Sequence, residues 1–337
     1  MDQRLEQLEQ WIVQPLPQHF PHWGDDYTLA PASADASFRR YFRLTAAQQG
    51  ESLGESLIVM DAPPEKEDSA PFVAIAETLQ RCGVQAPALH AVDLQQGFML
   101  LSDLGSTPYL NQLNAQHAEQ LYGDAMEALL LLQQQWPATD HPLPAYDHAL
   151  LMREMELFRE WYLQLHRDYP LSVAEQQMLD QQFTLLSEVA LSQPRVAVHR
   201  DYHSRNLMVT RSGNPGVIDF QDAVWGPITY DLVSLLRDCY IDWPQVEIER
   251  WTAHYHQQLI EREMISATVD HQQFTHWFDW MGVQRHLKAI GIFARLNHRD
   301  GKPGYLNDIP RTLNYVAEVS GRYPELAPLH ELTSRLL

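Results

Sequence analysis

Three side chains with oxygen donors, Asp201, Asn206 and Asp219, lie close together in the sequence. Short apolar runs rich in β-branched residues flank them, and the turn residues 212–215 predict a small hairpin. Asn206 would start its first strand and Asp219 would end its second, so we expect the three side chains to converge. Mg²⁺ takes oxygen ligands, usually one or two carboxylates together with phosphate oxygens and water. The trio predicts a magnesium–nucleotide site in which Asn206 and Asp219 hold the metal, while Asp201 orients a hydroxyl and accepts its proton.

Each of these residues also has a simpler interpretation. Asp201 alone could cap a loop, and Asn206 alone could be a turn residue. His199, Asp201 and His203 alternate along the chain, which raises a zinc hydrolase as a competing class. Zinc sites draw on several convergent His or Cys ligands, and no other histidine stands at a familiar ligand spacing. The combination of the three oxygen donors therefore favours magnesium, and we expect His203 to be a solvated loop residue.

Composition limits the classes of protein that fit. The 337 residues are 45% hydrophobic, enough for one large or two coupled domains. A net charge of -20 argues against nucleic acid or an anionic membrane as partner. Cys82 and Cys239 are far apart and suggest no disulfide framework. The polar, acidic stretch 1–10 is unlike a secretory signal, and the apolar run 128–132 is too short to cross a bilayer. We expect a soluble, cytoplasmic protein.

The hydrophobic pattern changes character along the chain. An amphipathic helix is expected over residues 2–14, and a second ends near Gly83. Short strands are expected in the first third, at residues 27–44, 57–60, 91–93 and 98–101. After a hinge at residues 102–105, helices dominate, at residues 118–136, 149–166, 173–191, 244–264, 271–296 and 308–320.

The central motif resembles that of a known family. His199-Arg200-Asp201 followed by Asn206 resembles the kinase pattern H-R-D-x-x-x-x-N, and Asp219-Phe220-Gln221 resembles D-F-G with glutamine in place of glycine. The A-P-E motif of regulated protein kinases is missing, and the chain passes directly through residues 225–227 to Asp231. This compact arrangement resembles the aminoglycoside/choline phosphotransferase family. Residues 33–44, 59–68 and 281–311 are similar to bacterial N-acetylmuramate/N-acetylglucosamine anomeric kinases of cell-wall recycling.

The resemblance implies an α+β, two-lobe protein-kinase-like fold with a small, mainly antiparallel β lobe and a larger helical lobe. Residues 1–104 would form the nucleotide-binding lobe, and residues 105–337 the lobe with the catalytic loop and substrate site. It also implies ATP and Mg²⁺ as cofactors and a sugar substrate phosphorylated at its anomeric hydroxyl. We expect a monomer. His199 and Asp231 would brace the catalytic loop, although Asp231 could also be a helix N-cap.

In a kinase-like chain, the phosphate-covering loop would follow the first strand. This stretch contains no glycine, so Ser33, Ser37 and nearby backbone N–H groups would have to bind phosphate. Arg39, Arg40 and Arg43 follow immediately and are candidates for pairing with phosphate. Salt bridges to the abundant carboxylates are the alternative.

The position of the phosphate-pairing strand lysine is occupied by Met60. Lys66 is the nearest lysine, and Glu77 resembles the helix glutamate that would pair with the missing lysine, with an ordinary surface residue as its alternative. In this architecture, backbone groups from Leu101 to Asp103 would hydrogen-bond the adenine edge.

Substrate recognition is expected from the second lobe. Arg285 and Lys288 could pair with a substrate carboxylate, and Trp225 or Tyr305 could stack on a sugar ring. Asp222 could bind sugar hydroxyls. The alternative for the basic pair is a helix that neutralises acidic neighbours. Asp238 is also a possible hydroxyl ligand, but we expect it to be a surface carboxylate.

Three alternative functions stay open. Another small-molecule kinase, acting on choline, an aminoglycoside, a homoserine-like alcohol or another sugar, is the first alternative. A protein Ser/Thr kinase is the second. A non-catalytic nucleotide-binding module is the third, because Met60 replaces the strand lysine.

Overall fold

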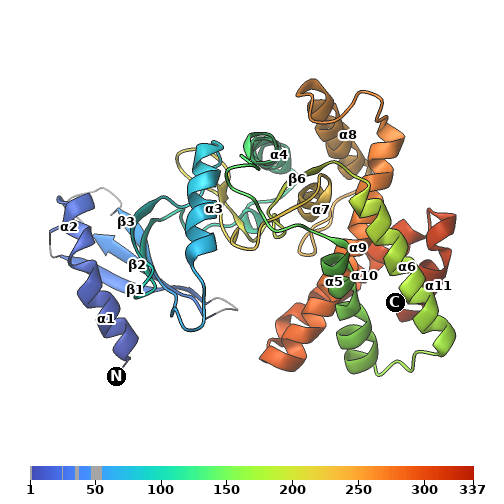
Figure 1. The fold of residues 1–337 in the computed structure, drawn as a ribbon, viewed down its shortest axis with the longest axis horizontal. Helices are drawn as coiled ribbons and strands as arrows, with labels where there is room; N and C mark the ends of the chain where they lie inside the picture. The colour runs from blue at the N-terminus through green and yellow to red at the C-terminus, as the bar shows by residue number, and fades with distance from the viewer. Residues whose placement is uncertain (1, 25, 35–37, 47–54) are drawn as a thin grey trace. The chain divides into compact units, whose positions relative to one another are not determined.

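A computed structural model describes residues 2–24, 26–34, 38–46 and 55–337. Its internal contacts divide the chain into two compact units (Figure 1). One comprises Met1–Thr107 together with Met208–Gln221, and the other comprises Pro108–Leu207 together with Asp222–Leu337. The first unit carries an antiparallel sheet and the second is mainly helical, so the predicted α+β class with a small β lobe and a larger helical lobe is confirmed.

The first unit is built on a five-stranded antiparallel sheet in the order β1-β2-β3-β5-β4. Its strands are β1 (Tyr27–Ala34), β2 (Arg40–Ala46), β3 (Ser56–Asp61), β4 (Leu89–Asp93) and β5 (Phe98–Ser102). Alternation within β2 and β3 turns apolar side chains to one face, where Leu44 and Leu57 are opposite each other across the strands. The hairpin of β7 (Leu207–Met208) and β8 (Gly216–Val217) follows later in the chain.

Helices cover this sheet. From α1 (Gln3–Ile12) and α2 (Pro15–His19), Leu8, Ile12 and Leu16 pack into one core with the sheet's apolar face. In Figure 1, α3 (Ala70–Arg81) stands on the other side of the strands from α1. The sheet is therefore a rigid platform for the loops at its ends.

The second unit packs around one long buried helix, α9 (His271–Asp300). Asp270 caps its start, and Gly301, with a φ of 64°, ends it in the left-handed conformation that glycine favours. Helix α9 packs against α5 (His148–Leu157), α6 (Val173–Leu191), α7 (Tyr230–Leu236) and α10 (Ile309–Ser320). At Gly291 a Cβ atom would lie 2.3 Å from the carbonyl carbon of Leu157, so only glycine permits this close approach of the two backbones.

The other elements of this unit surround α9. Its helices are α4 (Ala118–Gln135), α5 (His148–Leu157), the π-helical segment Phe158–His166, α6 (Val173–Leu191), α7 (Tyr230–Leu236), α8 (Gln245–Glu261), α10 (Ile309–Ser320) and α11 (Ala327–Leu336). Strand β6 (Arg195–Val198) pairs with β9 (Val224–Pro227), and the catalytic-loop motif follows β6 directly. Short 3₁₀ turns lie at Tyr109–Asn111, Pro303–Asp308 and Pro324–Leu326. Within the described ranges, no helix has the length and apolar character needed to span a bilayer.

His286, at the centre of α9, makes the stability of this unit sensitive to acid. Its ring stacks on Tyr315 at 4.9 Å between centroids, and its Nε2–H donates to the Arg237 carbonyl at 2.9 Å. Burial lowers the pKa of His286 to about 3. In the unfolded chain its pKa is about 6.5. Below pH 6.5 the unfolded state therefore binds a proton that the folded state does not, and the free energy of unfolding falls by up to about 1.4 kcal/mol per pH unit.

We expect the His286→Gln variant to lose stability less steeply than the parent protein as the pH falls from 6.5 to 4.5. Urea unfolding at several pH values measures these slopes. His298→Gln is the matched control, because His298 lies exposed on the same helix. Parallel slopes for the parent and the His286 variant would show that this ring does not cause the acid sensitivity.

Candidate functional site

The loop at residues 199–206 is held by a buried carboxylate on α7. Asp231 accepts the backbone N–H of His199 at 2.6 Å and that of Arg200 at 3.0 Å. Burial raises the pKa of Asp231 to about 7, and these two donors oppose the rise. His199 Nδ1 accepts the backbone N–H of Asp201 at 3.2 Å. These are the contacts that loop-bracing residues would make, and they hold Arg200 in a left-handed conformation with φ 76°.

Asp201 and Asn206 are brought together by this loop. The Asn206 Nδ2 group donates to the Asp201 backbone carbonyl at 3.0 Å. The donor end of the amide is thus used within the loop, and an amide binds a cation through its oxygen. Burial raises the pKa of Asp201, but Lys288 and His203 lower it, and the net shift is downward. Asp201 is therefore ionised at neutral pH and able to accept a proton from a hydroxyl group.

Asp219 belongs to the first unit and ends the segment that follows β8. It takes a left-handed conformation with φ 65°, and Gln221 Nε2 donates to its Oδ1 at 2.7 Å. Phe220 packs against Phe72 of α3 at 4.9 Å between ring centroids. The convergence of Asp219 with Asn206 stays a prediction.

The donor chemistry of these residues fits magnesium better than zinc. One carboxylate and one amide oxygen, completed by phosphate and water, is a set that Mg²⁺ accepts. Among the residues that the structure describes, no three His, Cys, Asp or Glu side chains gather closely enough to hold a metal by themselves. The zinc hydrolase alternative therefore has no supporting cluster in that part of the chain.

A buried ionic cluster lies directly behind the loop, and we did not anticipate it from the sequence. Glu154 of α5 accepts from Arg200 Nη2 at 2.5 Å and from Lys288 Nζ at 3.2 Å through the same oxygen. Its other oxygen accepts the Tyr146 hydroxyl and, at 3.4 Å, the Gln284 amide. Burial raises the pKa of Glu154, but the two cations outweigh it and the net shift is downward. The loop arginine is thus fixed to α5 by a charged hydrogen bond, and Glu154 is in turn bonded to Lys288 and Gln284 of α9.

This cluster changes the interpretation of the basic residues on α9. Lys288 is buried, and besides Glu154 it donates to the Tyr230 hydroxyl at 3.0 Å. Arg285 is buried as well, with its Nη1 3.6 Å from the Cys239 sulfur. For Lys288 the structure matches the alternative in which the helix neutralises an acidic neighbour.

The other predicted substrate residues are more accessible. Asp222 is exposed, and its backbone carbonyl accepts from Arg200 Nη1 at 3.3 Å. Trp225 lies half-buried in β9, where its carbonyl accepts the backbone N–H of Tyr146. Tyr305 stacks on Phe293 with 5.8 Å between ring centroids. Their contact with a substrate stays a prediction.

Asp238 was expected at the surface, and this expectation is wrong, whereas His203, expected to be a solvated loop residue, is half-buried in its loop. Asp238 is buried and accepts the backbone N–H groups of Ser204 at 2.9 Å and Tyr240 at 3.0 Å, which fixes the far end of the loop. His203 packs edge-on against the Tyr240 ring at 5.2 Å, and burial lowers its pKa. Both environments have the same cause, because the chain after α7 folds back over the loop and brings Asp238 and Tyr240 against it.

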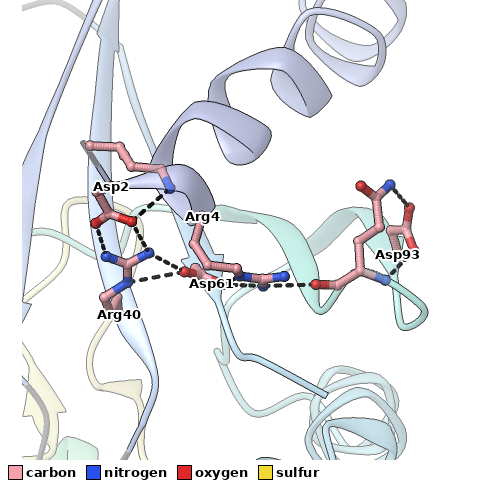
Figure 2. A network of polar contacts seen from close by, with 7 residues as sticks. Asp2, Arg4, Arg40, Asp61 and Asp93 are labelled. Carbon is pink, nitrogen blue, oxygen red and sulfur yellow. Dashed lines mark hydrogen bonds and ion pairs between the residues drawn. The ribbon is translucent and has the colours of Figure 1, made fainter. Parts of the chain in front are cut away.

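In the first unit, the predicted phosphate-binding arginines have carboxylate partners. Figure 2 shows Arg40 between Asp61 and Asp2, with Arg40 Nη2 2.6 Å from the buried Asp61 carboxylate. Arg4 of α1 reaches the same carboxylate and also donates to the Gln96 carbonyl at 2.8 Å. This network fastens the N-terminal helix to the sheet, which corresponds to the salt-bridge alternative for Arg40.

The neighbouring arginines behave alike. Arg39 Nη2 lies 3.2 Å from Glu67 Oε2, and Arg43 Nε lies 2.6 Å from Asp103 Oδ2. Burial raises the pKa of Asp103, but the hydrogen bonds that Arg43 and Ser56 donate to its carboxylate lower the pKa, and the net shift is downward. Ser37 and the side chain of Ser33 lie outside the described residues.

The sequence also predicted nucleotide-binding positions in the first unit. Met60 is buried in β3 opposite Met99, and Leu101 pairs with Ile58 across β3 and β5. Glu77 is exposed on α3, which matches the alternative that it is an ordinary surface residue. Lys66 Nζ lies 4.7 Å from the Phe38 ring centroid. The adenine-binding role of the backbone at residues 101–103 stays a prediction.

Comparison with known proteins gives a consistent result. The sequence model of the phosphotransferase enzyme family matches residues 28–265. An N-acetylmuramate/N-acetylglucosamine kinase of Pseudomonas putida is 48% identical over 99% of this chain and 97% of its own length. A protein of the same name from Neisseria meningitidis serogroup B is 41% identical over 99% of this chain and 96% of its own.

Solved structures share the fold at low sequence identity. Choline kinase from Cryptosporidium parvum Iowa II superimposes with a TM-score of 0.63 at 14% identity, over 96% of this chain and 99% of that one. The ADP-bound aminoglycoside phosphotransferase APH(2'')-Ib gives a TM-score of 0.56 at 15% identity, over 93% and 99%. These likenesses concern the fold alone, and they confirm the predicted kinase-like fold class.

Proposed function

Because the chain belongs to the phosphotransferase enzyme family, we propose that it transfers the γ-phosphoryl group of ATP to the anomeric hydroxyl of N-acetylmuramate and N-acetylglucosamine. Such a reaction would serve peptidoglycan recycling. The observation that carries the proposal is the braced loop, in which Asp201 and Asn206 are joined and Asp231 fixes the backbone. Full-length similarity to kinases named for these two sugars supports the choice of acceptor.

The proposed roles follow from the chemistry of the side chains. Ionised Asp201 orients the anomeric hydroxyl and accepts its proton. Asn206 and Asp219 are the proposed magnesium ligands. When bound, the metal would offset the negative charge of the phosphates. Phosphoryl transfer depends mainly on placement and charge stabilisation, so a loop held rigidly from behind suits it.

The nucleotide is proposed to bind the first unit through backbone groups near Leu101 and Asp103. The three arginines of residues 39–43 make ion pairs in this structure, so a direct role in phosphate binding requires them to exchange partners. Trp225 and Tyr305 are the proposed stacking residues for the sugar.

A substrate panel tests the proposal. The purified protein is incubated with ATP and Mg²⁺ and with single acceptors, namely the two N-acetylated sugars, choline, ethanolamine, homoserine and kanamycin, and ATP consumption is followed. We expect turnover with the N-acetylated sugars and a sugar 1-phosphate by phosphorus NMR. Turnover confined to an amino alcohol or an aminoglycoside would establish another small-molecule kinase. ATP binding without consumption for any acceptor would favour the non-catalytic module.

A further inference from the structure

Arg205 occupies an unusual place in the catalytic loop. It lies between Asp201 and Asn206 in sequence, and its side chain is 41% exposed. Its guanidinium carbon is 3.6 Å from the centroid of the Tyr240 ring and 5.6 Å from that of Tyr305. A planar guanidinium packed on aromatic faces keeps its orientation while its N–H donors point outward in the plane. The packing therefore fixes the position of the positively charged Arg205 guanidinium at the loop.

The donors of Arg205 are not engaged by a strong internal partner. The nearest carboxylate is Asp308, whose Oδ2 lies 3.9 Å away, and Arg311 is closer to that side chain at 3.5 Å. Within the described ranges this long ion pair is the one carboxylate contact of the Arg205 guanidinium. Lys288, in contrast, is buried in its ion pair with Glu154. An exposed arginine whose carboxylate partner lies 3.9 Å away and is shared with Arg311 can exchange that partner for an anionic ligand.

The surroundings of Arg205 suit a sugar ring. Tyr240, Phe293 and Tyr305 form a continuous row of aromatic rings, with 6.1 Å and 5.8 Å between successive ring centroids. Phe293 is buried, so the half-buried rings of Tyr240 and Tyr305 are the ones that a ligand could reach. His203 joins the row edge-on at Tyr240. Two polar atoms of this region, His203 Nδ1 and Arg285 Nε, are buried and have no hydrogen-bond partner among the described residues. Flat apolar faces with a few convergent polar groups are typical of small-molecule sites.

We propose that Arg205 binds the carboxylate of an acidic acceptor sugar and thereby sets the preference between the two sugars. This inference rests on the proposed function. N-acetylmuramate carries a lactyl carboxylate that N-acetylglucosamine lacks, so one cation can distinguish them. Arginine binds a carboxylate through two parallel N–H···O bonds, and charged bonds of this kind are stronger than neutral ones. Arg205 takes the role that the sequence assigned to Arg285 and Lys288.

Steady-state kinetics of Arg205→Gln with each sugar test the inference. Because a hydrogen bond to a charged group contributes about 1.5–3 kcal/mol, we expect kcat/KM for N-acetylmuramate to fall about 10- to 100-fold. The loss should appear mainly in KM, since the contact is made equally in the ground and transition states. For N-acetylglucosamine we expect a change below about threefold. Arg205→Lys should restore part of the preference, because it keeps the charge but not the two-pronged geometry.

Arg322→Gln is the matched control. Arg322 lies in the same unit, is 38% exposed, and has a comparably distant carboxylate, Asp279 at 3.7 Å. Its loss should leave the ratio of kcat/KM values for the two sugars unchanged. An equal loss for both sugars in Arg205→Gln would show that Arg205 only supports the loop, and the inference would be wrong while the proposed function stands. If the parent protein phosphorylates neither sugar, the proposed function fails and the inference falls with it.

Discussion

Replacing Asp201 with asparagine is expected to lower kcat by about 10²- to 10⁴-fold, the usual contribution of a general base. The ionised carboxylate is held beside Lys288 and His203, which lower its pKa. An amide of the same shape cannot accept the proton of a sugar hydroxyl. A coupled assay of ADP release measures the loss.

Nucleotide binding should survive this change, because Asp201 is not among the residues proposed to bind ATP. Calorimetric titration with ATP and Mg²⁺ should give a dissociation constant within about threefold of the parent value, well under the tenfold that 1.4 kcal/mol represents. Asp140→Asn, at an exposed carboxylate of the same unit, should keep full turnover. Near-normal turnover in Asp201→Asn would remove Asp201 from its assigned role.

The fold was predictable where the sequence pattern is local. The helix at residues 173–191 coincides with α6, whose start is fixed by a capping box between Ser172 and Glu175. The helix expected over residues 271–296 continues to Asp300, because Gly301 is the residue that can close it. The helix expected at residues 149–166 changes to a π-helical segment at Phe158. That change depends on packing against α9, which periodicity cannot reveal.

The candidate site was predictable only along the loop itself. The spacing of Asp201 and Asn206, with Asp231 further on, gave residues that the structure joins through the loop backbone. The ionic partners behind the loop could not be found in this way, since Glu154 is 46 positions from Arg200 and 130 from Gln284. The exposure of Asp238 was misjudged for the same reason. A charged residue in a polar stretch indicates surface on average, and only tertiary contacts show the exceptions.

The Glu154 cluster leads to the second large expected effect. Glu154→Ala should lower the free energy of unfolding by about 3–5 kcal/mol, because it leaves the buried Lys288 and the half-buried Arg200 without a counter-charge. Since Arg200 directly precedes Asp201, we also expect kcat to fall. Urea unfolding, with the m-value checked for constancy, measures the first effect, and the ADP-release assay measures the second.

Two variants distinguish the loss of a buried counter-charge from other causes of the lower stability. Glu156→Ala removes a carboxylate of the same helix that is 30% exposed and pairs with Arg159 one turn away, so it should cost less than about 1 kcal/mol. The double variant Glu154→Ala with Lys288→Met also removes one of the two uncompensated cations, and we expect it to be more stable than Glu154→Ala alone. If the double variant were instead the sum of two independent losses, the instability would come from the cavity left by Glu154. In that case Lys288 and Glu154 would not act as a coupled pair behind the catalytic loop.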